Sequence, residues 1–190
     1  MTFFETRTAY VVLFAVGFVL YGHTLFFREY THQDDYHLIV VNYPLISDPA
    51  HITKAFVEEA FHERKQGGNI YRPFLTLSLM LDAQLSGTNP LGYRLHNLLL
   101  HGFATVLLFV TLTRLNLRRE VAFFSALLFA VHPATTQTVV WIPGRNDLLL
   151  ALFLFLSLLS LLRFKKLPQL RWVFLHGFFF ACALFTKETA

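Results

Sequence analysis

Two adjacent carboxylates, Asp34 and Asp35, lie between histidines in the stretch THQDDYH, residues 31–37. The chain just before them is apolar enough to cross a membrane, so the acidic pair stands at the edge of the lipid. Two neighbouring carboxylates repel each other, and beside a low-dielectric layer they need a compensating cation or a shared proton. Such a group can act as a general base or as a ligand of a divalent cation.

The histidines beside the acidic pair do not identify a metal. His32 and His37 could add ligands, but their spacing matches no specific metal signature. The identity of any bound metal is therefore unknown. A solvated acidic turn without chemistry is the alternative for Asp34 and Asp35, and the residues alone leave that choice open.

The elements that must position these groups are apolar helices. Hydrophobic residues make up 55% of the 190 residues and charged residues only 15%, whereas charged residues approach about a quarter of a soluble domain. An α-helix needs about 20 residues to cross the hydrocarbon layer. We predict an all-α multi-pass membrane protein with about five transmembrane helices, at approximately 9–27, 91–112, 121–141, 148–162 and 172–186.

Lysine and arginine in short connections predict the orientation, because their translocation across a membrane is disfavoured. Two connections carry most of these cations: Arg114, Arg118 and Arg119 in one, and Arg163, Lys165, Lys166 and Arg171 in the other. Placing both in the cytoplasm puts the N-terminus there as well. Residues 28–90, the loop around Arg145 and the stretch 186–188 then face the other side. The net charge of +4 does not indicate a nucleic-acid partner, since the cations lie in these connections and not on one face.

The long first outer loop, residues 28–90, carries one or two predicted interfacial helices. Asp48 and Pro49 are typical of a helix start, and Ile52, Ala55, Phe56 and Ala60 follow at helical spacing until Gln66-Gly67-Gly68 ends the helix. A second apolar stretch, residues 73–85, is too short to span a membrane. An interfacial or a re-entrant helix fits that length.

Several polar residues lie at membrane depth, where ionisable groups default to functional or paired roles. At the outer end of the second segment, interhelical hydrogen bonding or snorkelling to the interface is the favoured interpretation for Arg94, His96, Asn97 and His101. The isolated His23 and His176 are interpreted as structural, and Cys182 as a small core residue.

A break is predicted at His132-Pro133, because Pro133 frees a backbone carbonyl and the residues after it, 134–137, are small and polar. Such a break needs protein or water to cover it. The loop at residues 142–147 is then expected to bring Arg145 and Asp147 to the outer surface, with Asp147 able to cap the fourth helix.

These pieces together resemble a known family. They are the Asp34-Asp35 pair, Tyr71-Arg72-Pro73-Phe74, GYRLHNLLLHGFATVLL (92–108), FAVHPATTQTVVWIPGRNDLLLALF (129–153) and the final TKETA. Their order and spacing are similar to the N-terminal membrane half of the C-type glycosyltransferases. The branch that they resemble is that of the transmembrane O-mannosyltransferases with tetratricopeptide repeats and their bacterial relatives. The resemblance covers nearly all of residues 1–190.

The resemblance implies an enzyme that transfers a sugar from a polyprenyl-phosphate carrier to an acceptor, a protein hydroxyl or a glycan, on the non-cytoplasmic face. The membrane would be the bacterial cytoplasmic membrane, or that of the endoplasmic reticulum in a eukaryote. Asp34 or Asp35 would be the catalytic base or a carboxylate associated with a divalent cation. The substrate-binding residues would be Tyr71, Arg72, His132, Arg145, Asp147, Lys187 and Glu188. Among these, the cations would stabilise the departing phosphate, and Glu188 would pair with or orient Lys187.

The sequence also departs from the family pattern. Gln137 stands where related sequences commonly have a glutamate, which argues against an acid or metal role at that position. The repeat domain and the later membrane helices would follow residue 190, so we expect this fragment to be inactive alone.

Two other classes remain open. A transporter or channel would carry charge near the bilayer midplane, whereas the charges here cluster at helix ends. In a non-catalytic scaffold, Asp34 and Asp35 would only complement Arg72.

Overall fold

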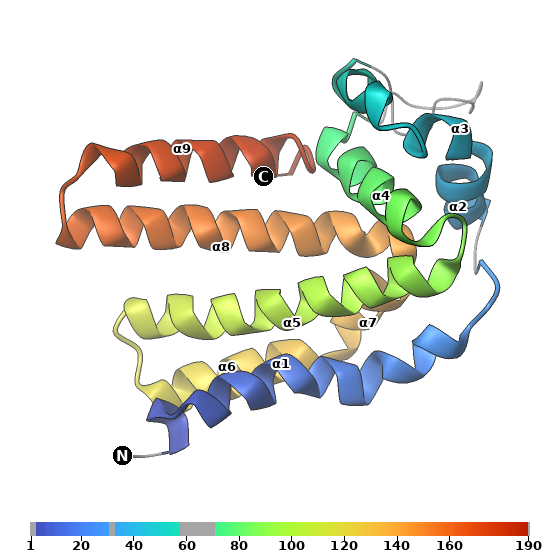
Figure 1. Cartoon of the computed structure of the whole chain (residues 1–190). Helices are drawn as coiled ribbons and strands as arrows, with labels where there is room; N and C mark the ends of the chain where they lie inside the picture. Colours follow the sequence, from blue (N-terminus) through green and yellow to red (C-terminus); the bar gives the residue numbers. More distant parts are fainter. Residues whose placement is uncertain (1–2, 31–32, 58–70, 190) are drawn as a thin grey trace.

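The computed structural model describes residues 3–30, 33–57 and 71–189, and these ranges contain helices but no strand (Figure 1). The long helices lie side by side in one bundle: α1 (Arg7–Tyr21), α5 (Pro90–Arg114), α6 (Arg119–Val131), α8 (Arg145–Lys166) and α9 (Leu170–Leu184). The predicted all-α class is confirmed.

Three helical stretches are long and apolar enough to cross a membrane, namely Arg7–Phe26, Pro90–Arg114 and Ile142–Lys166. A fourth span is formed if α6 and the following α7 (Pro133–Val140), which meet at a bend of 58°, are counted together. The fifth predicted segment, 172–186, forms α9, which has only 15 residues. That is short of the roughly 20 residues that a span needs. The described residues therefore support three or four spans where the sequence predicted about five.

The observed boundaries follow local chemistry. α5 starts with Pro90 at its first position, and the side chain of Asn89 accepts a hydrogen bond from the backbone N–H of Leu91 at 3.1 Å. The first predicted helix, 9–27, is continuous only to Tyr21 and then tightens into the 3₁₀-helix η2 (Gly22–Phe26).

The outer loop contains short helices that gather at one end of the bundle (Figure 1). They are α2 (Gln33–Tyr36), the π-helix η3 (His37–Val41), α3 (Tyr43–Ile46), the 3₁₀-helix η4 (Pro49–Phe56) and α4 (Pro73–Ser86). Asp48 caps η4 through the backbone N–H of Ala50, at 2.9 Å. The predicted continuation to Ala60 and the stop at 66–68 lie outside the described residues.

α4 corresponds to the predicted helix at 73–85, and it packs against other helices of the bundle. Leu75 and Leu79 are completely or almost completely buried, and α4 contacts α3, α5 and α8. These leucines belong to a core with Leu38, Ile39, Ile46, Met80, Ala83, Tyr93 and Ile142. The outer loop is thereby fixed onto the ends of α5 and α8.

α1 and α5 approach each other closely. A Cβ atom on Gly102 would lie 2.8 Å from the ring of Phe14, so this position excludes a larger residue unless the ring moves. Toward the other end of the bundle, α1, α5 and α6 share an apolar core of Ala9, Leu13, Phe109, Ala122, Phe123 and Ala126.

The bundle has two distinct ends. We call the end at which α5 and α8 begin and α9 finishes the site end, and it carries the outer-loop helices. We call the opposite end, with the connections α5–α6 and α8–α9, the basic end, because the cations used to predict orientation lie there.

Candidate active site

Asp34 and Asp35 lie together in the single turn α2 at the site end. Asp35 is completely buried, whereas Asp34 is only half-buried. α2 packs against η5 (Ile142–Gly144), the 3₁₀ turn that leads into α8. Two segments more than a hundred residues apart in the chain are therefore brought together. His32 lies outside the described residues.

Arg94 supplies positive charge beside Asp35. Its buried guanidinium donates hydrogen bonds to the carbonyls of Phe27 at 2.6 Å and Glu29 at 2.8 Å. Arg94 also interacts electrostatically with Asp35. It therefore holds the chain between α1 and α2 in place and balances the buried acid.

Tyr30 lies beside Asp35 and Arg94. Burial, and then the negative charge of Asp35, raise the pKa of Tyr30 to about 12. Its hydroxyl donates to the backbone carbonyl of Thr88, at the turn before α5. Tyr30 therefore stays neutral at physiological pH and ties the acidic turn to α5.

Arg145 does not lie at the outer surface, and the prediction that it does is wrong. Its side chain is completely buried and ion-paired with Asp82 at 2.5 Å. It also donates to the side chain of Asn97 and to the backbone carbonyl of Tyr93, both at 2.8 Å. Gly144, the residue before it, lies so close to α7 that an added Cβ would be 2.8 Å from the carbonyl of Thr138, so a larger residue does not fit there without a shift of the backbone. Arg145 thus connects α4, α5 and α8 from within.

Asp82 was missed by the sequence reasoning. This buried residue of α4 pairs with Arg145 and also lies 2.7 Å from Nδ1 of His96. The available signal was a single carboxylate within the apolar stretch 73–85, which is expected to have a buried partner. The prediction of interhelical hydrogen bonding for His96 and Asn97 is confirmed.

The predicted break at His132-Pro133 is present, and protein groups cover it. His132 caps α7, since its Nδ1 accepts the backbone N–H of Ala134 at 3.1 Å. That N–H would otherwise bond to the carbonyl of Ala130 in a continuous helix. The Ala130 carbonyl instead lies 3.0 Å from Nε2 of the buried His101. The imidazole ring of His132 is solvent-exposed.

The two histidines that were interpreted as structural, His23 and His176, lie within hydrogen-bonding distance of neighbouring groups. His176 of α9 lies 2.7 Å from the hydroxyl of Ser157 in α8, and this contact joins the two helices. His23 is 3.1 Å from the carbonyl of Leu20 in its own helical segment. Cys182 is a free buried thiol in α9.

Four of the predicted binding residues form two ion pairs at the site end. Arg72 pairs with Glu188 at 3.1 Å and Lys187 pairs with Asp147 at 2.6 Å. Two expectations are corrected here. Glu188 forms its ion pair with Arg72, and Lys187 acts on it only through its charge. Asp147 does not cap α8, because the helix already begins at Arg145. The two pairs link the ends of α4, α8 and α9.

The exposure of these groups differs within each pair. The side chains of Arg72 and Lys187 are only 18% and 26% exposed, whereas those of Glu188 and Asp147 are 69% and 47% exposed. A backbone N–H and, after it, the Arg72 guanidinium hold the pKa of Glu188 below its usual range. The cations are thus fixed in place while their carboxylate partners face solvent.

Two further predictions concern Tyr71 and a divalent-cation site. The half-exposed Tyr71 donates from its hydroxyl to the carbonyl of Phe56 at 2.9 Å. Within residues 3–30, 33–57 and 71–189, no three metal-ligating side chains of His, Cys, Asp or Glu come together. The acidic pair of α2 could therefore contribute carboxylate oxygens to a hard divalent ion, but not a complete coordination shell from side chains in these ranges.

Residues 73–190, well over half of the chain, match the family described as dolichyl-phosphate-mannose-protein mannosyltransferase. The chain belongs to this mannosyltransferase family. The predicted membership of a membrane glycosyltransferase family is confirmed. The buried Arg145–Asp82 pair, the Lys187–Asp147 pair and the α6–α7 break all lie inside the matched range, and Arg72 lies one residue before it.

Individual relatives of this mannosyltransferase-family chain support the same branch. It is 31% identical to the human Protein O-mannosyl-transferase TMTC1 over a match that covers 95% of this chain and 22% of the relative. It is 34% identical to the mouse Protein O-mannosyl-transferase TMTC4 over 62% of its length and 19% of the relative. It is 37% identical to the Drosophila melanogaster Protein O-mannosyl-transferase Tmtc1 over 63% of this chain and 14% of the relative.

The chain therefore spans about a fifth or less of the length of these curated relatives. No solved structure gives a significant match to it.

Proposed function

We propose that the whole protein transfers mannose from a polyprenyl-phosphate carrier to a hydroxyl group of a protein acceptor, on the non-cytoplasmic face of its membrane. Family membership supports the sugar and the reaction class. The observation that carries the site is the placement of the acidic turn α2 at the same end of the bundle as Arg72 and Lys187. The membrane would be the bacterial cytoplasmic membrane, or the endoplasmic reticulum membrane in a eukaryote.

Asp34 is proposed as the general base. It is half-buried, so an acceptor can reach it, whereas Asp35 is completely buried beside Arg94. The acceptor hydroxyl gives its proton to the Asp34 carboxylate, and its oxygen forms a bond to the anomeric carbon of mannose. The bond from that carbon to the phosphate oxygen breaks, and the phosphate leaves with the electron pair. Displacement from the opposite side inverts the anomeric centre.

Arg72 and Lys187 are proposed to bind the carrier phosphate. A departing phosphate needs positive charge where its own charge develops. Because the partner carboxylates Glu188 and Asp147 are exposed, a phosphate can displace them without moving the cations. The exposed Tyr71 and His132 are left for contacts with the sugar or the acceptor. Arg145, being buried, acts by positioning η5 against the acidic turn.

A divalent cation, if the full-length protein binds one, would be held by Asp34 or Asp35. Such an ion supplies charge that orients and neutralises the phosphate. Carboxylate oxygens suit Mg²⁺ or Mn²⁺, although the described residues offer few further ligands.

The acidic pair can be tested in the full-length protein, by measuring mannose transfer from a polyprenyl-phosphate donor to an acceptor peptide. Asp34→Asn should lower kcat by about 100-fold or more, because a positioned general base contributes about that much. Asp35→Asn should lower transfer as well, through loss of the charge that faces Arg94. Asp48→Asn is the control, since that acid of the same outer loop caps η4. Repeating each assay with EDTA and with added Mn²⁺ tests the cation.

Full activity in both Asp34→Asn and Asp35→Asn would remove the carboxylate role. Loss of activity in Asp48→Asn to the same extent would show that the outer loop merely fails to fold.

A further inference from the structure

A cavity of about 540 Å³ lies at the basic end, far from the proposed active site. It is open to the surface along α8, between α5 and α9. Its lining comprises Val110, Arg114, Leu156, Leu159, Ser160, Leu162, Arg163, Lys166, Trp172, Leu175 and Phe179. Since α5 has 25 residues, its two ends are about 37 Å apart at 1.5 Å per residue. The cavity therefore belongs to the opposite headgroup layer.

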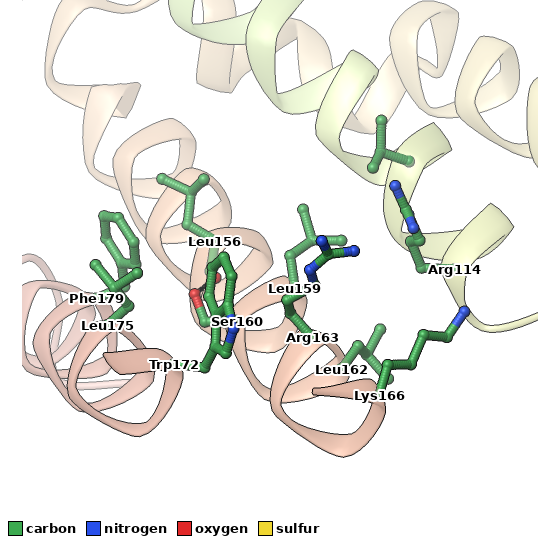
Figure 2. A pocket seen from close by; sticks show the side chains of 11 residues that line it. Arg114, Leu156, Leu159, Ser160, Leu162, Arg163, Lys166, Trp172, Leu175 and Phe179 are labelled. Atoms are coloured by element: carbon green, nitrogen blue, oxygen red, sulfur yellow. Dashed lines mark hydrogen bonds between the residues drawn. The ribbon is translucent and has the colours of Figure 1, made fainter. Parts of the chain in front are cut away.

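The lining has two chemically different parts. Leucine and aromatic side chains from α8 and α9 form the walls deeper in the bundle, and Leu156, Leu159 and Arg163 follow at helical spacing on α8. Three cations stand around the opening: Figure 2 shows Arg114 on α5, with Arg163 and Lys166 on α8. A cavity with apolar walls and a cationic opening is complementary to a molecule that has an anionic headgroup and an acyl chain.

The cations of the cavity are available to a ligand. Within residues 3–30, 33–57 and 71–189, none of Arg114, Arg163 and Lys166 forms an ion pair with an acidic side chain. The Arg163 guanidinium lies 5.7 Å from the centre of the Trp172 ring, which fixes it beside the opening. Three cations at one opening repel one another, so an anion placed between them would be bound favourably.

Trp172 gives a second, independent indication. Its indole N–H is buried and has no hydrogen-bond partner among the described residues. A buried indole N–H ordinarily finds an acceptor. Because Trp172 lines this cavity, an ester or phosphate oxygen of a ligand in the cavity could accept that bond.

We propose that this cavity binds an anionic phospholipid, with its phosphate between Arg114, Arg163 and Lys166 and one acyl chain along Leu156, Leu159 and Phe179. Basic cavities between membrane helices are known to bind anionic headgroups. The positive charge of the opening favours an anionic over a zwitterionic headgroup, and the apolar walls favour a ligand with an acyl chain over free phosphate. The bound lipid fills the gap between α5, α8 and α9, and this site is separate from the one proposed for mannose transfer.

The test uses the full-length protein, delipidated in detergent and then given equal amounts of phosphatidylglycerol and phosphatidylcholine with identical acyl chains. Native mass spectrometry counts the lipids that each protein retains. The wild-type protein should retain phosphatidylglycerol preferentially. The pair Arg163→Gln/Lys166→Gln should lower its affinity about tenfold or more, since each cation near an anionic headgroup contributes substantially.

The matched control is Arg118→Gln/Lys165→Gln, which removes the same amount of charge from the basic end but from residues that do not line the cavity. It should retain phosphatidylglycerol as the wild type does. Equal retention of the two lipids by the wild type would overturn the proposal. So would equal retention of phosphatidylglycerol by both double variants, which is also the result expected if another helix of the full-length protein fills the cavity.

Discussion

At the scale of single residues, the strongest constraint at the site end is a buried charge pair. Arg145 is completely buried and Asp82 nearly so, at a separation of 2.5 Å. Removing charges from water is costly, and only close pairing with additional hydrogen bonds offsets that cost. Asn97, Ser78 and the Tyr93 carbonyl supply those bonds. The pair therefore specifies how α4 and α8 meet.

Neutralising one member of this pair should be strongly destabilising. Asp82→Asn leaves Arg145 buried without its counter-charge, and we expect the free energy of unfolding to fall by about 3–5 kcal/mol. SDS titration of the full-length protein in mixed micelles measures this change. Glu188→Gln, which breaks an exposed pair, should cost less than about 1 kcal/mol. The double variant Asp82→Leu/Arg145→Met should regain most of the loss, and equal effects of Asp82→Asn and Glu188→Gln would contradict this interpretation.

At the scale of elements, the bend of 58° between α6 and α7 is stabilised by specific hydrogen bonds. Pro133 cannot donate a backbone hydrogen bond, and the N–H of Ala134 turns to His132. The carbonyl of Ala130 is then met by His101 of α5. A neighbouring helix thus supplies what the broken helix lacks, as membrane-embedded chain requires.

This predicts a specific cost for removing the imidazole. His101→Leu keeps an apolar side chain of similar size but leaves the Ala130 carbonyl unsatisfied, which should destabilise the protein by about 1–3 kcal/mol. Thermal unfolding of the full-length protein in detergent would detect the change. His23→Leu is the comparison, because that histidine is exposed and lies within hydrogen-bonding distance of the Leu20 carbonyl in its own helical segment. If both variants unfold at the same temperature, His101 does not support the break.

At the scale of the whole molecule, the bundle separates two kinds of charge. The acidic turn, the two ion pairs and the exposed His132 lie toward the site end, while the cations around the cavity lie at the basic end. Cations in short connections favour the cytoplasm. The proposed reaction and the proposed lipid site would therefore face opposite sides of one membrane.

Cysteine labelling can test this arrangement. In full-length protein without other reactive cysteines, Thr88→Cys at the site end should react with a membrane-impermeant maleimide added from the non-cytoplasmic side. Gln169→Cys, in the connection between α8 and α9, should react only after the membrane is permeabilised. Both positions are exposed, so burial does not explain a difference. Reaction of Gln169→Cys from the non-cytoplasmic side would reverse the proposed orientation.

By itself the sequence determined the elements: the helical class, the approximate helix ranges, the break at His132-Pro133 and the family, because apolar run length, proline and local motifs act over a few neighbouring residues. It did not determine which charges meet. Arg145 turned inward to Asp82, Glu188 met Arg72, and Lys187 met Asp147. Only the tertiary structure decided these pairs, since the partners lie 40 or more residues apart and are chosen by the way the helices pack.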